Sequence, residues 1–257
     1  MMDKKDFPLM EYDDEKTSLI NPNENIQPLD FQPEKCVVCF FQEVIDKLDS
    51  EGRLKVLAEL RSEIGKHKVY EFEYKGEKIA LFHPTVGAPN AAGLLEEVIA
   101  LGSRKFIACG GAGVLDANVG LGHIVIPQTA VRDEGTSYHY LPPSREVEAS
   151  IEGINAIKSA LNKSGHKYVV SKTWTTDAFY RETAGKIKLR RSEGCVTVEM
   201  ECAAFFAVAK FREVVFAQML YGGDDLSSEK WDSREWQKEI SVRERLFWLA
   251  AESCLYL

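Results

Sequence analysis

Two pairs of carboxylates stand out among the residues of this 257-residue chain that are able to do chemistry. Glu199 and Glu201 flank Met200, and Asp224 and Asp225 follow two glycines after an apolar run. A carboxylate accepts hydrogen bonds from hydroxyl groups, and a carboxylic acid can donate a proton to a leaving group. If Glu199 and Glu201 lie on a helix they face different directions, so we expect at most one to reach a given ligand. Alone, the first pair is also typical of a solvated helix face and the second of an Asp-capped turn.

A glycine-rich segment and an aromatic pair add to this set. Gly110-Gly111-Ala112-Gly113 is similar to a phosphate cradle, but it lacks the G-x-G-x-x-G dinucleotide pattern and no P-loop lysine follows it. A tight turn that lets backbone approach backbone explains the glycines equally well. Phe179 and Tyr180 are able to stack on a flat base, although adjacent aromatic residues more often belong to a core.

The six cysteines include Cys36-Val37-Val38-Cys39, which has the spacing of a metal or redox site. Valines separate the two thiols, Phe40 follows them, and the chain has no second pair at zinc-ribbon spacing. We therefore interpret them as buried strand thiols and expect no metal. A redox or zinc protein remains a weaker alternative that metal analysis tests.

Hydrophobic periodicity predicts strands that alternate with helices along most of the chain. Continuous apolar runs and one hairpin pattern predict strands at residues 35–41, 69–74, 78–83, 105–109, 124–126, 168–174 and 214–220. Helical spacing predicts helices at residues 54–64, 91–101, 146–161, 198–211 and 234–255. We expect residues 110–113 to form a turn after the central strand. This alternation is typical of an α/β fold, here a single domain over residues 35–257 with an extended arm at residues 1–34.

In open α/β sheets, ligands bind beyond the carboxyl ends of the strands. The candidate site therefore comprises the segments that follow strands, and residues 198–201 if their helix opens toward the same edge. These segments contain Glu43, Val86, Gly87, the glycines, the aromatic pair and Asp224, and they contain few cations. That inventory suits a sugar and a flat base better than a polyphosphate.

Composition narrows the class of partner. The chain carries 40 acidic and 32 basic residues and a net charge of −8, which argues against duplex nucleic acid or an anionic membrane as partner. No run approaches the ~20 apolar residues of a membrane helix. The charged amino terminus is unlike a signal peptide, and with the cysteine usage it leads us to expect a cytoplasmic location with reduced thiols.

Taken together, these segments resemble the nucleoside phosphorylase superfamily, which includes purine nucleoside phosphorylases, uridine phosphorylases and methylthioadenosine/adenosylhomocysteine nucleosidases. The resemblance extends from about residue 35 to 228 and implies a phosphorylase/hydrolase-like fold with a central twisted mixed β-sheet flanked by helices. The motifs that carry it are TVGAPN at 85–90, GGAGVL at 110–115, GHIV at 122–125, VRDEGTS at 131–137, TDAFY at 176–180 and VEMECAA at 198–204.

The resemblance implies roles for individual residues. Glu201 is expected to accept hydrogen bonds from the ribose 2′- and 3′-hydroxyls, with Met200 packing on the sugar and Phe179 stacking on the base. Asp224 matches the acid that protonates a purine leaving group, and Asp225 is the alternative because the usual Ser-Asp reads Gly223-Asp224 here. Oligomers, as dimers or hexamers, are usual in this family.

The group that attacks C1′ is less clear, because the family includes phosphate-dependent and water-dependent enzymes. The Gly-Asp-Pro loop and the arginines that hold phosphate in the phosphorylases are absent: the first strand continues into Phe40-Phe41, one arginine position reads Ala108, and a hydroxyl position reads Gly111. Glu43 lies where the nucleosidases carry the glutamate that activates water. We therefore expect a nucleosidase without a cofactor; if the chain is a phosphorylase, phosphate is the co-substrate.

Two features of the sequence indicate different bases for the nucleoside. The glutamine and arginine with which uridine phosphorylases read uracil are missing near Thr183 and Gly185, which favours a purine. Residues 131–140, however, are closer to the uridine enzymes. A non-catalytic nucleoside or nucleotide sensor is a further alternative, because a fold does not fix a function. A nucleoside panel with and without phosphate distinguishes the three.

Overall fold

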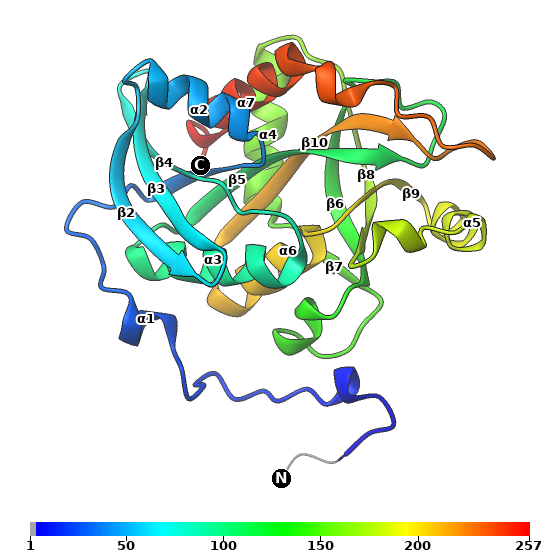
Figure 1. Cartoon of the computed structure of the whole chain (residues 1–257), viewed down its shortest axis with the longest axis horizontal. Coiled ribbons are helices and arrows are strands. Elements are labelled where there is room, and N and C mark those ends of the chain that lie inside the picture. Colours follow the sequence, from blue (N-terminus) through cyan, green and yellow to red (C-terminus); the bar gives the residue numbers. More distant parts are fainter. Residues whose placement is uncertain (1–3) are drawn as a thin grey trace.

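The computed structural model describes residues 4–257, in which strands and helices alternate as the sequence predicts (Figure 1). The strands are β1 (Lys35–Cys39), β2 (Lys55–Ser62), β3 (Gly65–Tyr74), β4 (Glu77–Phe82), β5 (Lys105–Val114), β6 (Ile124–Asp133), β7 (Glu146–Glu148), β8 (Tyr168–Thr176), β9 (Cys195–Glu199) and β10 (Val215–Asp225). The α-helices are α1 (Pro22–Asn25), α2 (Gln42–Ser50), α3 (Ala88–Leu101), α4 (Ile151–Lys163), α5 (Ala184–Ser192), α6 (Cys202–Arg212) and α7 (Ile240–Cys254). Short 3-10 helices are η1 (Pro8–Met10), η2 (Thr136–His139), η3 (Phe179–Arg181) and η4 (Trp236–Lys238).

The strands form one mixed sheet that closes on itself at one side. β5 is central, and β1 and β10 run parallel to it on its two sides. β10 also pairs with β6, β6 with β8, β8 with β9, and β9 returns to the far end of β5, so these pairings make a closed ring. Beyond β1 the sheet continues through β4, β3 and β2. The predicted α/β fold with a mixed sheet flanked by helices is confirmed.

Helices cover both faces of the sheet. Figure 1 shows α3 and α6 on one side of it and α2 and α7 on the other. A stack of buried rings fixes α6: Phe216 lies with its ring centroid 4.8 Å from that of Phe205 and 6.1 Å from that of Phe106. Because an apolar side chain contributes ~1.5–3 kcal/mol when it is fully buried, this stack is a substantial part of the attachment of α6 to the sheet.

The predicted helix at residues 54–64 is wrong, because this segment is strand β2. β2 pairs antiparallel with β3 from Lys55 opposite Glu71 to Ser62 opposite Gly65. Leu60 is its only buried residue, so the apolar spacing does not reflect a helical face. The free edge of β3 offers the segment a complete ladder of backbone hydrogen bonds, and this tertiary pairing outweighs the local pattern.

The glycine-rich segment and three element boundaries also differ from the prediction. Residues 110–113 continue strand β5 rather than forming a turn, and none of their glycines has a positive φ. The helices predicted from residues 146, 198 and 234 begin at Ile151, Cys202 and Ile240. The first two are preceded by strands β7 and β9, whose short lengths give no alternation long enough to recognise.

The amino-terminal arm lies along the face formed by α3, α6 and η2, and its first three residues lie outside the described residues. Gln32 Nε2 donates to Ser103 Oγ at 2.8 Å, and Lys16 Nζ lies 4.2 Å from the centroid of the Phe211 ring. Farther along, η1 lies beside η2. Figure 1 shows the arm as an extended segment outside the body of the domain.

Cys36 and Cys39 are fully buried in β1, as the sequence predicts, and burial raises the pKa of the Cys36 thiol. No helix between residues 4 and 257 combines the length and apolar character needed to span a bilayer.

Candidate functional site

The carboxyl ends of the central strands bring the predicted segments together at one edge of the sheet. β1, β4, β5 and β10 all point the same way, because β1 is parallel to β4 and β5, and β5 is parallel to β10. The residues that follow or end these strands therefore share an edge. β9 approaches it from the opposite direction, with Val198 opposite Gly113 of β5.

The loop between β4 and α3 donates a backbone hydrogen bond to one of the predicted carboxylates, that of Glu201. The Gly87 N–H donates to Glu201 Oε1 at 2.6 Å, so the start of α3 contacts the start of α6. Thr85 adopts φ 64°, a left-handed conformation that is rare for a β-branched residue. Asn90 donates to the Thr85 hydroxyl, and the Thr85 N–H donates to His83 Nδ1 at 2.9 Å. Such strain persists only where its surroundings enforce it, and it is frequent at binding sites.

From the sequence we expect at most one of Glu199 and Glu201 to reach a ligand, because on a helix they would face different directions. The structure separates the two for another reason. Glu199 ends β9 and Glu201 is the N-cap residue of α6, so the two do not share a helix face. Glu199 accepts the N–H groups of Glu201 and Cys202 at 2.7 and 2.6 Å and the Thr175 hydroxyl at 2.6 Å. Glu199 therefore caps the amino-terminal end of α6 and has a structural role.

Both carboxyls are buried, and burial shifts their titration. Burial raises the pKa of Glu201 to about 8, with a further contribution from the charge of Glu199. Burial likewise raises the pKa of Glu199 to about 7, against the lowering effect of its hydrogen bonds. Buried carboxyls with displaced pKa values are frequent at functional sites, although structural groups show them too.

The two aspartates at the end of β10 separate clearly in the structure. Asp225 forms an ion pair with Arg234 and accepts the Ser227 N–H at 2.7 Å, so it holds the loop that follows the strand. Asp224 accepts the Trp231 indole N–H at 2.7 Å. Its Oδ1 lies 3.6 Å from the point where a Cβ on Gly113 would stand. Asp224 is thus the aspartate directed toward β5, whereas Asp225 is bound to Arg234 and Ser227.

Gly113 links the two ends of the candidate site. It lies opposite Val198, one residue before Glu199, and beside Asp224. A Cβ at Gly113 would stand 2.9 Å from Val198 Cγ1 and 2.6 Å from Leu226 Cδ1, so there is no room for a side chain at this position of β5. β9 and β10 both approach β5 closely at this glycine; Asp224 lies near the end of β10, and Glu201 follows the end of β9 by two residues.

The aromatic pair lies outside the core. Phe179 and Tyr180 are 52% and 88% exposed, and their ring centroids are 4.1 Å apart. They begin η3, which is followed by Glu182 and then α5. Exposed rings are able to stack on a flat base, whereas a core role is excluded.

An arginine that the sequence analysis did not identify, Arg243, forms an ion pair with Glu43. Arg243 of α7 binds Glu43 Oε1 through Nη1 at 2.5 Å and the Tyr221 hydroxyl through Nε at 3.1 Å. The Tyr221 ring lies 3.0 Å from where a Cβ on Gly111 would stand. Glu43 and Arg243 are separated by 200 residues, and Arg243 belongs to no recognisable motif, so no local pattern announces the pair.

The glycines of β5 accommodate aromatic rings. The Phe40 ring lies 3.0 Å from where a Cβ on Gly110 would stand, as the Tyr221 ring does at Gly111. Gly110 is buried and Gly111 is exposed. Close packing of side chain on backbone therefore explains the glycines, and the extended backbone does not form an anion-binding loop.

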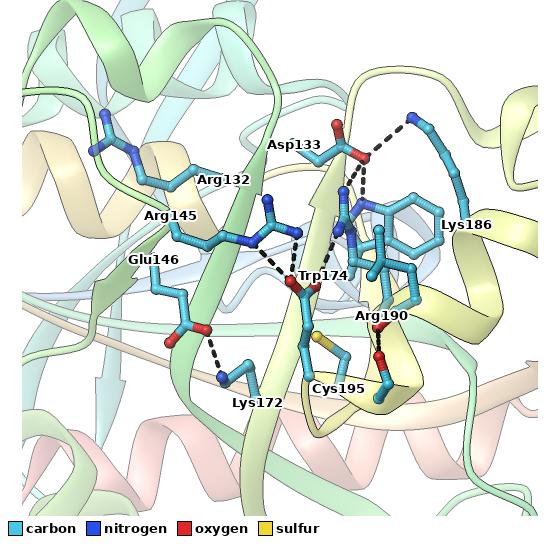
Figure 2. A network of polar contacts seen from close by, with 12 residues as sticks. Arg132, Asp133, Arg145, Glu146, Lys172, Trp174, Lys186, Arg190 and Cys195 are labelled. Atoms are coloured by element: carbon cyan, nitrogen blue, oxygen red, sulfur yellow. Dashed lines mark hydrogen bonds and ion pairs between the residues drawn. The ribbon is translucent and has the colours of Figure 1, made fainter.

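A polar network anchors α5 to β6 and β8 (Figure 2). Asp133 Oδ2 accepts from Trp174 Nε1 at 3.0 Å, Lys186 Nζ at 3.1 Å and Arg190 Nη2 at 3.0 Å. Arg190 also binds Glu193 at 2.9 Å. Because only Glu182 and Thr183 separate η3 from α5, anchoring α5 limits where the aromatic pair can lie.

The remaining predicted residues lie nearby with less defined contacts. Val86 is 67% exposed, and Met200 is half-buried between the two glutamates. In residues 4–257 no group of three or more His, Cys, Asp or Glu side chains is arranged to hold a metal ion.

Comparison with known proteins gives consistent results. The family model described as the phosphorylase superfamily matches residues 35–246. A guanosine phosphorylase from Halorubrum lacusprofundi is 26% identical over 60% of this chain and 64% of its own length. A uridine phosphorylase from Thermococcus kodakarensis is 33% identical over 46% of this chain and 44% of its own. The chain thus spans between about half and two thirds of these relatives.

Two solved structures share the fold. A uridine phosphorylase from Vibrio fischeri superposes with a TM-score of 0.72 at 22% identity, covering 91% of this chain and 95% of that one. An AMP nucleosidase from Bacteroides thetaiotaomicron superposes with a TM-score of 0.70 at 20% identity, covering 86% of each chain.

Proposed function

The chain belongs to the phosphorylase superfamily, and from this premise we propose that it cleaves the N-glycosidic bond of a nucleoside. One observation carries the proposal: buried Glu201, fixed by the Gly87 N–H, follows the end of β9 by two residues, Asp224 lies near the end of β10, and both strands pair with β5 around Gly113. Breaking a glycosidic bond develops positive charge on the sugar and negative charge on the base. One carboxyl group near the sugar and another near the base would address both charges.

Glu201 serves the sugar end. Its carboxylate accepts hydrogen bonds from the ribose 2′- and 3′-hydroxyls, with Met200 and the exposed Val86 beside the sugar. Gly87 holds the carboxyl at 2.6 Å, so the group is positioned before the nucleoside arrives. Burial raises the pKa of Glu201 to about 8 in the free protein, and hydrogen bonds donated by the two ribose hydroxyls favour its ionised form. A negative charge at this position favours the oxocarbenium-like transition state over the neutral ground state.

The base lies against Phe179 and Tyr180 and faces Asp224. Stacking on an exposed ring provides affinity for any flat base, and a carboxyl near the base supports proton transfer to it. A purine is favoured, since purine nitrogens accept a proton readily and a guanosine phosphorylase is among the relatives.

We assign water as the acceptor, activated by Glu43. Arg243 holds this carboxylate at 2.5 Å, which fixes its orientation. Phe40 and Tyr221 fill the space against Gly110 and Gly111 where a phosphate-binding loop would need open backbone N–H groups. Phosphate carries close to two negative charges, so a carboxylate at this position disfavours it.

Phosphorolysis is the second candidate, because Arg243 supplies a cation next to Gly111 and both curated relatives described above are named phosphorylases. In that case phosphate would displace Glu43 from Arg243 and act as co-substrate. No other cofactor is needed for either reaction. We further propose a homo-oligomer as the working form.

The experiment is a panel of purine and pyrimidine nucleosides, incubated with the protein with and without phosphate and analysed by chromatography. Free base and ribose without phosphate support hydrolysis, whereas base with ribose-1-phosphate only when phosphate is present supports phosphorolysis. A ligand-induced rise in melting temperature with no base released in either buffer contradicts the proposal and indicates a sensor.

A further inference from the structure

The loop that follows β10 folds back on the end of that strand. Asp225 and Asp232 form an antiparallel bridge, in which the Asp225 N–H donates to the Asp232 carbonyl at 2.7 Å and the Asp232 N–H donates to the Asp225 carbonyl at 3.0 Å. Arg234 forms an ion pair with Asp225 and donates to the Val119 carbonyl at 3.1 Å. Backbone and side-chain contacts therefore hold residues 226–234 against the end of β10.

This arrangement brings the Trp231 indole to the carboxyl of Asp224. Each of these residues precedes one member of the bridge, so they are diagonal neighbours on one face, a separation that an aromatic side chain spans. Trp231 Nε1 donates to Asp224 Oδ2 at 2.7 Å. Trp231 is 65% exposed and so buries little apolar area, which means that packing does not explain a tryptophan here. The indole N–H is the part of this side chain that the fold uses.

The hydrogen bond makes the two oxygens of Asp224 unequal. Among residues 4–257 the donor to this carboxyl is Trp231, and it binds Oδ2. Oδ1 lies on the side of β5, 3.6 Å from the point where a Cβ on Gly113 would stand, and it accepts no hydrogen bond from the described part of the chain. In a carboxylic acid, the carbonyl oxygen accepts and the hydroxyl oxygen donates. A proton on Asp224 is therefore held on Oδ1, where it is free to pass to a ligand.

The same hydrogen bond becomes stronger as the proton leaves Asp224. A donor forms a shorter and stronger hydrogen bond with a carboxylate than with a neutral acid. An N–H that is already aimed at the group where negative charge develops stabilises the transition state more than the ground state. The Trp231 N–H is placed in this way on the carboxyl that faces the base in the proposed function, so its contribution is expected in kcat rather than in KM.

We propose that Trp231 is a positioning residue for proton transfer to the leaving base: its N–H keeps the proton of Asp224 on Oδ1 and stabilises the carboxylate that forms. This inference rests on the proposed function and deepens it. As the C1′–N bond breaks, its electron pair stays with the base, and the Oδ1 proton passes to a base nitrogen. Water adds to C1′ and gives its proton to Glu43. The products are free base and ribose, and proton exchange with solvent restores Asp224 and Glu43.

The test compares guanosine with 7-methylguanosine. Methylation gives N7 a positive charge in advance, so this base leaves without a proton. Loss of one preorganised donor costs on the order of 100-fold in a closed site, and water partly replaces an exposed donor, so kcat of Trp231→Phe for guanosine is expected to fall about tenfold with KM nearly unchanged. Because 7-methylguanosine needs no proton from Asp224, its kcat is expected to stay within about threefold of wild type.

Trp248→Phe is the matched control. The Trp248 ring stacks on that of Tyr74 with centroids 5.6 Å apart, and its N–H donates to no group in the part of the chain that the structure describes. This variant removes an indole of α7 without removing a hydrogen bond, and it is expected to leave kcat for both nucleosides unchanged.

A double variant tests whether Trp231 acts through Asp224. Asp224→Asn has no acidic proton, so kcat for guanosine is expected to fall about 100-fold or more. Adding Trp231→Phe to Asp224→Asn is expected to change kcat by less than about twofold, because the indole then has no carboxyl to act on. Losses that multiply in the double variant, an equal loss on both nucleosides in Trp231→Phe, or no loss on guanosine overturns the role of Trp231 alone. Wild-type protein that releases base from neither nucleoside overturns the proposed function together with it.

Discussion

The Gly87 N–H donates to the Glu201 carboxylate at 2.6 Å and so joins the first residues of α3 and α6 across the edge of the sheet. The contact requires Gly87 at φ 99°, which side-chain-bearing residues rarely adopt, and it follows a Thr85 that is itself left-handed. The loop between β4 and α3 is therefore shaped to present a backbone donor to one buried carboxyl. A carboxyl held in advance loses little freedom when it binds the sugar.

Replacing Glu201 by glutamine tests its role at the sugar. Glutamine keeps the volume and one carbonyl oxygen, but it loses the charge that binds the two ribose hydroxyls. Hydrogen bonds to charged groups contribute about 1.5–3 kcal/mol each, so kcat/KM is expected to fall about 100- to 1,000-fold. The steady-state rate of base release measures this. A variant with wild-type kcat/KM would show that Glu201 does not contact the substrate.

The raised pKa values of Glu199 and Glu201 predict how stability depends on pH. Their pKa values rise from an ordinary 4.5 to about 7 and about 8, so between these limits the folded state binds more protons than the unfolded state. The contribution of these two carboxyls to the free energy of unfolding is therefore fully present below about pH 4.5. It decreases as pH rises toward 8, by on the order of a few kcal/mol. Melting temperatures of wild type and Glu201→Gln across this range measure the effect. The variant is expected to lose less stability as pH rises, and parallel curves would contradict the assignment.

The central strands, and the segments that follow them, were predictable from the sequence. Central strands such as β1, β5 and β10 are covered on both faces, so their apolar runs are continuous. Once their order is known, the rule that ligands bind beyond strand carboxyl ends identifies the segments around Gly87, Glu201 and Asp224. In the structure the Gly87 N–H contacts Glu201 and Asp224 lies beside Gly113, while the roles of these residues at a site stay a prediction.

What the sequence could not provide are contacts made across long separations. β2 owes its conformation to the free edge of β3 and buries only Leu60, so its own residues carry no reliable signal. The ion pair of Arg243 with Glu43 and the capping role of Glu199 depend on tertiary packing. Gly110 and Gly111 were interpreted as a turn because glycine is also selected by the close approach of rings, here Phe40 and Tyr221.

Gly113 is expected to be sensitive to the smallest enlargement. In Gly113→Ala the new Cβ would lie 2.6 Å from Leu226 Cδ1 and 2.9 Å from Val198 Cγ1, so β9 or the end of β10 must shift. Overpacking typically costs ~1–3 kcal/mol, and the shift would also displace Asp224. We expect a lower melting temperature and a reduced kcat.

Gly93→Ala is the matched control for that substitution. Gly93 lies inside α3 with nothing within 4 Å of its ideal Cβ position, and its φ is not positive. Alanine in a helix interior is favoured over glycine by roughly 0.5–1 kcal/mol, so this variant is expected to be slightly more stable and fully active. If Gly113→Ala matched this control in stability and kcat, the proposed close approach of the strands would be wrong.

The acceptor assignment predicts unequal effects of two ion pairs that join the same helices. Glu43 of α2 binds Arg243 of α7 at 2.5 Å, and Lys47 of α2 binds Glu244 of α7 at 2.7 Å. If Glu43 activates water, Glu43→Gln is expected to lower phosphate-independent base release about 100-fold or more, the effect of losing a general base. Glu244→Gln breaks the more exposed pair, which contributes at most ~1 kcal/mol, and is expected to leave kcat unchanged. Rates measured with and without phosphate separate the two candidate reactions: undiminished hydrolysis in Glu43→Gln contradicts its role as base, and a gain of ribose-1-phosphate formation in the same variant would show that Arg243, once released, binds phosphate.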